Sequence, residues 1–122
     1  MTTEEKQQRS HRDFPVWKAA MSLAETVYEI SAKFPADERF GLTAQIRRSA
    51  VSIPSSIAEG AGRSGTNELG HFLGVALGSA AELETQLELA DRLDLAEGFG
   101  EAFDQLEDVR KQLILFRRSL KT

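Results

Sequence analysis

The sequence contains no cysteine. This absence excludes thiolate nucleophiles, disulfide bonds and cysteine-ligated zinc, and it is typical of proteins from a reducing compartment. No apolar run approaches the roughly 20 residues that a membrane-spanning helix needs. The first residues, Met1 to Lys6, also lack the apolar segment of a secretory signal. We therefore expect a cytoplasmic protein that does not bind a membrane.

Basic residues are also outnumbered by acidic ones. Fifteen Lys and Arg residues face nineteen Asp and Glu residues, and the resulting net charge of −4 argues against a uniformly basic nucleic-acid binder. No stretch shows the alternation of apolar and polar residues that is typical of a β-strand. With 122 residues, of which 41% are hydrophobic, the chain is long enough for one domain with its own core.

Apolar residues instead recur in alternating steps of three and four, which is typical of amphipathic helices. Four such stripes occupy residues 16–34, 42–61, 69–90 and 102–120. Because short connectors join them, the sequence predicts an all-α fold, an up-down-up-down four-helix bundle.

We expect this bundle to span residues 13–122, with residues 1–12 as a flexible N-terminal arm. Pro54 lies inside the second stripe, where it removes a backbone hydrogen bond and costs about 3 kcal/mol in an unsupported helix. The apolar phase continues past Pro54 without a slip, so we predict a kinked helix rather than two separate ones. Gly60 and Gly62 are expected to end this helix.

Several stretches of the sequence resemble one known family, and together they cover nearly the whole chain from Phe14 onward. They are Phe14-Pro-Val-Trp17, Phe34-Pro35, Gln45-Ile-Arg-Arg48, Ser52-Ile-Pro-Ser-Ser-Ile-Ala-Glu-Gly-Ala-Gly-Arg63 and Gly78-Ser-Ala-Ala-Glu-Leu83. The family comprises four-helix-bundle proteins encoded in intervening sequences of 23S ribosomal RNA genes, sometimes labelled S23-like ribosomal proteins. The accessory variability proteins of diversity-generating retroelements look similar.

This resemblance implies a small bacterial bundle that assembles as a ring, a homopentamer. For the retroelement branch it also implies partnership with a reverse transcriptase and nucleic acid. Ser56 departs from the family pattern, which usually has Asn at this position.

Small residues recur beside the predicted core. Gly70, Gly74 and Gly78 follow one another every four residues in the third helix, although each glycine inside an exposed helix costs about 1 kcal/mol relative to alanine. A matching row in the second helix consists of Ser52, Ser56 and Gly60. Both rows indicate close approach of another backbone, either within one bundle or at a subunit interface.

The segment from Gly60 to Gly65 reads G-x-G-x-x-G, but it follows a predicted helix and not the strand that a dinucleotide site requires. We interpret it as a turn, with Arg63 and Ser64 as a weaker candidate for holding a phosphate or carboxylate. Glu68 and His71 have the spacing of half a di-iron site, but the sequence offers no second such pair. We expect no metal, no cofactor and no catalytic residue.

Five charged residues suit structural ion pairs rather than acid–base chemistry. Glu59 and Arg63 are four residues apart in the favourable order for a helical pair. Arg47 or Arg48 is expected to reach Glu82 on a neighbouring helix or on another subunit.

Charge is segregated along the predicted bundle. The segments expected at one end, residues 1–18, 57–74 and 110–122, hold ten basic and five acidic residues, whereas the rest of the chain holds five basic and fourteen acidic residues. In part this reflects the preference of cations for a helix C-terminus. The candidate residues for binding an anionic partner are Arg63, Arg110, Lys111, Arg117, Arg118 and Lys121.

These features predict a non-enzymatic, ring-forming adaptor. In a ring of parallel subunits the basic ends combine into one rim, which suits the phosphate backbone of RNA or DNA, or an acidic protein surface. Phe116 is assigned to the core, so no aromatic residue is left at this end for base stacking, and contact is expected to phosphate without sequence preference. The alternative is a scaffold that binds only proteins, for example as an accessory subunit of a reverse transcriptase.

Overall fold

The computed structural model describes residues 10–120, and these residues form four long helices and two short 3-10 helices. The 3-10 helix η1 (His11–Asp13) precedes α2 (Pro15–Ser31), and η2 (Ala36–Glu38) separates α2 from α3 (Leu42–Gly62). The last two helices are α4 (Thr66–Arg92) and α5 (Gly100–Ser119). No strand occurs within residues 10–120, and the predicted all-α four-helix bundle is confirmed.

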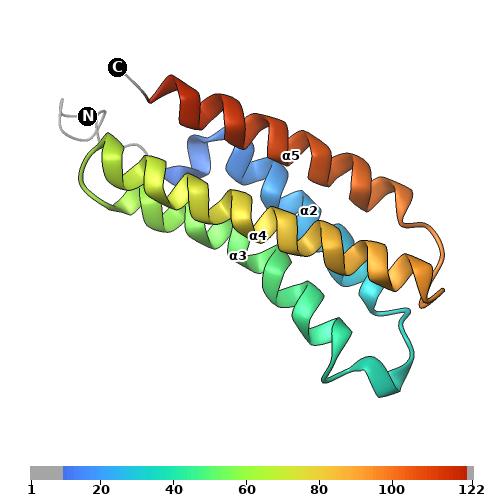
Figure 1. Cartoon of the computed structure of the whole chain (residues 1–122). Helices are drawn as coiled ribbons and strands as arrows, with labels where there is room; N and C mark the ends of the chain where they lie inside the picture. The colour runs from blue at the N-terminus through green and yellow to red at the C-terminus, as the bar shows by residue number, and fades with distance from the viewer. Residues whose placement is uncertain (1–9, 121–122) are drawn as a thin grey trace.

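Successive helices run in opposite directions and pack side by side (Figure 1). The backbones of α2 and α4 each lie next to those of α3 and α5, whereas the diagonal pairs α2 and α4, and α3 and α5, meet only through the core between them. The bundle therefore has four sides, and two opposite ones are called the α3–α4 face and the α2–α5 face below. The start of α2, the α3–α4 turn and the end of α5 gather at one end of the molecule, called the basic end below (Figure 1).

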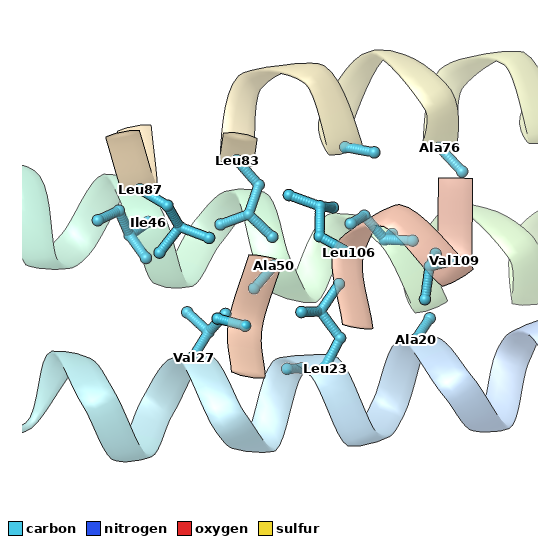
Figure 2. Packing of buried hydrophobic residues seen from close by; sticks show 14 of the residues in the cluster. Ala20, Leu23, Val27, Ile46, Ala50, Ala76, Leu83, Leu87, Leu106 and Val109 are labelled. Atoms are coloured by element: carbon cyan, nitrogen blue, oxygen red, sulfur yellow. The ribbon is translucent and has the colours of Figure 1, made fainter. Parts of the chain in front are cut away.

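One apolar core runs through the bundle, and all four predicted stripes contribute to it. Leu23 of α2, Ile46 of α3, Leu83 of α4 and Leu106 of α5 are all almost completely buried and lie within this core (Figure 2). Buried alanines, such as Ala50 of α3, let the helices approach closely.

Helix α3 continues through Pro54 as a single helix, and Pro54 is buried. The alternative of two separate helices meeting at this proline is therefore excluded. The predicted second-helix stop is only half right, because α3 ends at Gly62 but Gly60 is a buried residue inside the helix.

The short helix η1 packs against α2 and α3. In η1, the ring of His11 lies 5.1 Å from the ring of Trp17, and the Ser10 hydroxyl accepts the backbone N–H of Arg12 at 3.1 Å. Residues 1–9 of the predicted arm lie outside the described residues. No described helix is long and apolar enough to cross a lipid bilayer.

Candidate functional surfaces: the α3–α4 face and the basic end

Small residues bring α3 and α4 together within one chain. A Cβ placed on Gly60 would stand only 2.7 Å from the Cβ of Phe72, so any side chain there forces the helices to shift. Ser56 is buried beside it, and the hydroxyl oxygens of Ser52 and Ser79 lie 2.7 Å apart across the seam. The predicted row of Ser52, Ser56 and Gly60 thus packs against α4 of the same chain.

A polar groove of about 490 Å³ follows this seam on the α3–α4 face. It is lined by Gln45, Arg48, Ser49, Ser52, Ser79, Glu82 and Gln86. The Ser49 hydroxyl lies 2.8 Å from Gln86 Oε1 and donates a hydrogen bond to it. Arg48 and Glu82 share the groove, but within residues 10–120 neither of them belongs to an ion pair. The groove therefore contains a cation and an anion that have no ion-pair partner among the described residues.

The hydroxyl pair in the seam gives a direct test of this packing. We expect Ser79→Ala to lower the free energy of unfolding by about 0.5–1.5 kcal/mol, because it leaves the half-buried Ser52 hydroxyl without its partner. The double variant Ser52→Ala/Ser79→Ala should cost less than the sum of the two single variants, as measured by urea denaturation. Additive losses would show that the two hydroxyls are not coupled.

Arg47 does not reach Glu82 in this chain and instead turns toward α2. Its Nε donates to the Ser31 hydroxyl at 2.8 Å, and its Nη2 donates to the Tyr28 carbonyl at 3.4 Å. The guanidinium also lies 4.6 Å from the centre of the Tyr28 ring. Because this carbonyl belongs to the last turn of α2, a cation is favourable there, and Arg47 joins α3 to the end of α2.

Arg63 forms an ion pair with Glu59, with 2.9 Å between Nη2 and Oε2. The hydrogen bond and charge of Glu59 raise the pKa of Arg63. The same guanidinium lies 5.3 Å from the centre of the Phe72 ring, so it rests against α4. Both partners are exposed, so this pair contributes little to stability.

The glycines of α4 face different surroundings. A Cβ on Gly74 would stand 3.0 Å from Arg117 Nη2, because the Arg117 side chain of α5 crosses this glycine. A Cβ on Gly70 would meet only Leu120, at 4.0 Å, and Gly78 has nothing within 4 Å. The row is therefore covered in part by the chain itself, and Gly78 is left open.

The cations at the end of α5 are not equally available. Arg110 is bound by Glu107 through two hydrogen bonds of 2.7 and 3.0 Å, which lower the pKa of Glu107 and raise the pKa of Arg110. Lys111, Arg117 and Arg118 are exposed and form no ion pair within the described part of the chain. Lys121 lies outside the described residues.

The two remaining sequence motifs have ordinary structural roles. Gly65 adopts a positive φ of 90° as the residue preceding α4, a conformation that favours glycine. His71 is exposed and packs its ring 5.1 Å from that of Phe72. Among residues 10–120, no three His, Asp or Glu side chains cluster closely enough to hold a metal ion.

The α2–α5 face carries a second pocket, which the sequence analysis missed. It has a volume of about 470 Å³ and is lined by Asp13, Phe14, Pro15, Val16, Gln112, Leu115 and Phe116. Phe14 and Phe116 pack edge to face with 5.1 Å between ring centres, and Leu115 is 62% exposed. In the sequence, Leu115 is a leucine that lies outside the core stripe of α5. This position was the signal that could have indicated the pocket.

The sequence matches the family described as 23S rRNA-intervening sequence protein over residues 12–115. The chain belongs to this family. The matched residues of this family member include the whole α3–α4 face and most of the apolar pocket, whereas Arg117 and Arg118 lie beyond them. No curated protein matches the sequence.

Proposed function

We propose that this protein is a non-enzymatic adaptor that assembles with identical copies into a ring, a pentamer by family resemblance, and that its basic end binds the phosphate backbone of RNA. The observation that carries the proposal is the set of exposed cations near the end of α5, namely Lys111, Arg117 and Arg118, which have no ion-pair partner within residues 10–120. Arg117 lies against Gly74, so its guanidinium has a defined position beside α4.

The net charge of one chain is unfavourable for binding nucleic acid, but repetition of the chain in a ring would offset this. One chain carries −4, but its basic residues gather at one end, so parallel copies would present several such ends side by side. Clustered cations displace the counterions of a nucleic acid, and this supplies binding without sequence preference. Nearby aromatic rings are occupied, since Phe14 packs on Phe116 and Arg63 covers Phe72, which favours phosphate contact over base stacking.

We infer no reaction for this protein. The pKa shifts of Arg63, Glu107 and Arg110 arise from ion pairs at the surface. Catalytic acids and bases are instead tuned by burial or by charges inside a cleft. Shifts of the kind seen here indicate structural pairing.

Filter binding of labelled single-stranded RNA at two salt concentrations tests the proposal. We expect binding at low salt that weakens as salt rises, and the triple variant Lys111→Gln/Arg117→Gln/Arg118→Gln should lower the slope of log affinity against log salt by about 2. The matched control is Lys33→Gln/Arg39→Gln/Arg92→Gln, which removes the same charge from exposed residues at the opposite end. Equal losses in both variants would indicate a general charge effect and contradict a specific basic end.

The protein-only scaffold is the competing function. Wild-type protein that binds no RNA at low salt, while remaining oligomeric, would support this alternative and refute the RNA-binding half of the proposal. Its partner would then be an acidic protein surface at the same cations.

A further inference from the structure

The polar groove on the α3–α4 face has a floor of serines. Ser49 of α3 and Ser79 of α4 are only 7% and 9% exposed, and the Ser79 hydroxyl is paired with that of Ser52 on α3. Because serine is small, these residues join the two helices without filling the space above them. An open groove of about 490 Å³ remains, with α3 as one wall and α4 as the other.

Side-chain amides in this groove are available to a ligand. Gln86 accepts the Ser49 hydroxyl through its Oε1 atom, but its Nε2 forms no hydrogen bond within residues 10–120. Gln45 is exposed, and its amide likewise has no partner in the described part of the chain. A side-chain amide has a donor and an acceptor, which match the C=O and N–H of a peptide bond. The groove therefore suits a polypeptide backbone whose own N–H and C=O groups are unpaired.

The length of the groove fits a short extended segment. On α3 the lining runs from Gln45 to Ser52, a rise of about 10 Å at 1.5 Å per helical residue. Three residues of extended chain cover about the same distance. A helical ligand suits the amides less well, because its backbone groups are already bonded to one another.

The two walls of the groove carry opposite charges. Arg48 lies on the α3 wall and Glu82 on the α4 wall, and neither belongs to an ion pair within residues 10–120. Successive side chains of an extended chain point to opposite sides. Two adjacent residues of opposite charge on a bound segment can therefore reach both walls at once, the acidic one at Arg48 and the basic one at Glu82.

The other charged residues on these stretches of α3 and α4 face elsewhere. Arg47 is bonded to the end of α2, and Glu59, two turns beyond the groove, is bound by an arginine of its own helix. On α4, Glu84 and Glu88 are each two positions from the lining residue Gln86, and residues two apart on a helix point about 200° apart. The charge of the groove itself is therefore set by one cation and one anion.

We propose that this groove binds an extended segment of a partner protein in which an acidic and a basic residue are adjacent. Arg48 binds the carboxylate, Glu82 binds the ammonium or guanidinium group, and the amides of Gln45 and Gln86 bind the backbone between them. The site shares no residue with the cations of the basic end, so it requires no RNA.

Two tetrapeptides of identical composition test the proposal in an NMR titration of the full chain. The charges of Ac-Ala-Glu-Lys-Ala-NH2 are adjacent and point to opposite sides, whereas those of Ac-Glu-Ala-Lys-Ala-NH2 are two positions apart and point to one side. We expect the first peptide to bind about two- to fivefold more tightly, the range for one exposed ion pair. It should shift the backbone amide signals of Ser49, Ser52 and Ser79. Equal affinities, or shifts confined to other residues, would contradict the proposal.

Charge reversal separates recognition from a structural role. Arg48→Glu makes both walls acidic, and we expect it to weaken the binding of the adjacent-charge peptide about two- to fivefold. Arg48→Glu/Glu82→Arg restores opposite walls, and a shift of the peptide by one position should return its affinity to within about twofold of wild type. The matched control is Glu29→Lys/Lys33→Glu, which exchanges two exposed charges on and just after α2 and should leave the affinity unchanged. A double variant that does not regain binding would contradict recognition by the two walls.

A direct ion pair between Arg48 and Glu82 would overturn the proposal. In that case each single reversal would lower the midpoint of urea denaturation and the double reversal would recover it, while the adjacent-charge peptide would bind no more tightly than Ac-Ala-Gln-Gln-Ala-NH2. A groove that is covered by another copy of the chain would give no shift of the serine signals with any peptide, and this result would refute the proposal as well.

Discussion

Replacing Gly60 with alanine is expected to lower the free energy of unfolding by about 1–3 kcal/mol, the usual cost of forcing extra atoms into a packed core. Helix propensity alone predicts the opposite, since alanine is favoured over glycine inside a helix by about 1 kcal/mol. The steric term dominates because the new Cβ would stand 2.7 Å from the Phe72 Cβ and 3.4 Å from the Leu69 Cα. Neither atom is the free end of a flexible side chain, so α3 and α4 must separate.

Gly78→Ala is the matched control for this prediction. Gly78 also lies inside a helix, but nothing stands within 4 Å of its would-be Cβ, so only the gain in helix propensity remains. Urea denaturation should therefore show Gly78→Ala at or above wild-type stability and Gly60→Ala well below it. Equal midpoints for the two variants would mean that Gly60 is not a point of close approach.

The four helices were predictable because each carries a long periodic apolar stripe, and periodicity needs only local sequence. The residue that each small residue contacts on a neighbouring helix was not predictable. Gly60 and Gly74 are both helical glycines in the sequence, yet Gly60 meets Phe72 of the adjacent helix and Gly74 lies under Arg117, forty-three residues away. Such neighbours depend on how each helix is rotated about its own axis in the bundle. The apolar stripe alone does not fix this rotation closely enough to say which side chains meet.

The charged residues show the same limit. The pair of Glu59 and Arg63 follows from their spacing on one helix. Arg47 and Arg48 are adjacent in sequence, but successive helical residues point about 100° apart, so they face different neighbours. Arg47 turns to the end of α2 and Arg48 to the groove beside α4. Sequence alone treated the two arginines as equivalent candidates for Glu82.

The apolar pocket was missed for a related reason. The core stripe of α5 was assigned from residues that repeat in steps of three and four, and Leu115 lies outside that repeat. A single exposed leucine carries little information, because apolar atoms contribute much of any protein surface. It becomes informative only when the fold places it beside Phe14 and Phe116 in one pocket.

Leu83→Ala should be strongly destabilising, with a loss of about 2–5 kcal/mol in the free energy of unfolding. Leu83 has no solvent exposure and points into the core with Leu87 and Leu106 (Figure 2), so its removal leaves a cavity that tightly packed neighbours refill only in part. Such a loss is a large share of the total free energy of unfolding, which is typically about 5–15 kcal/mol for a whole domain.

The control is Leu93→Ala, because Leu93 is 54% exposed after the end of α4 and should change stability by no more than about 0.5 kcal/mol. Both variants must be measured over a range of protein concentrations. Association stabilises the folded chain by mass action, so a self-associating protein shows a midpoint that rises with concentration. If the core alone holds the fold, the difference between the two variants persists at the lowest concentration, whereas a Leu83→Ala loss that disappears there would mean that assembly had set the stability.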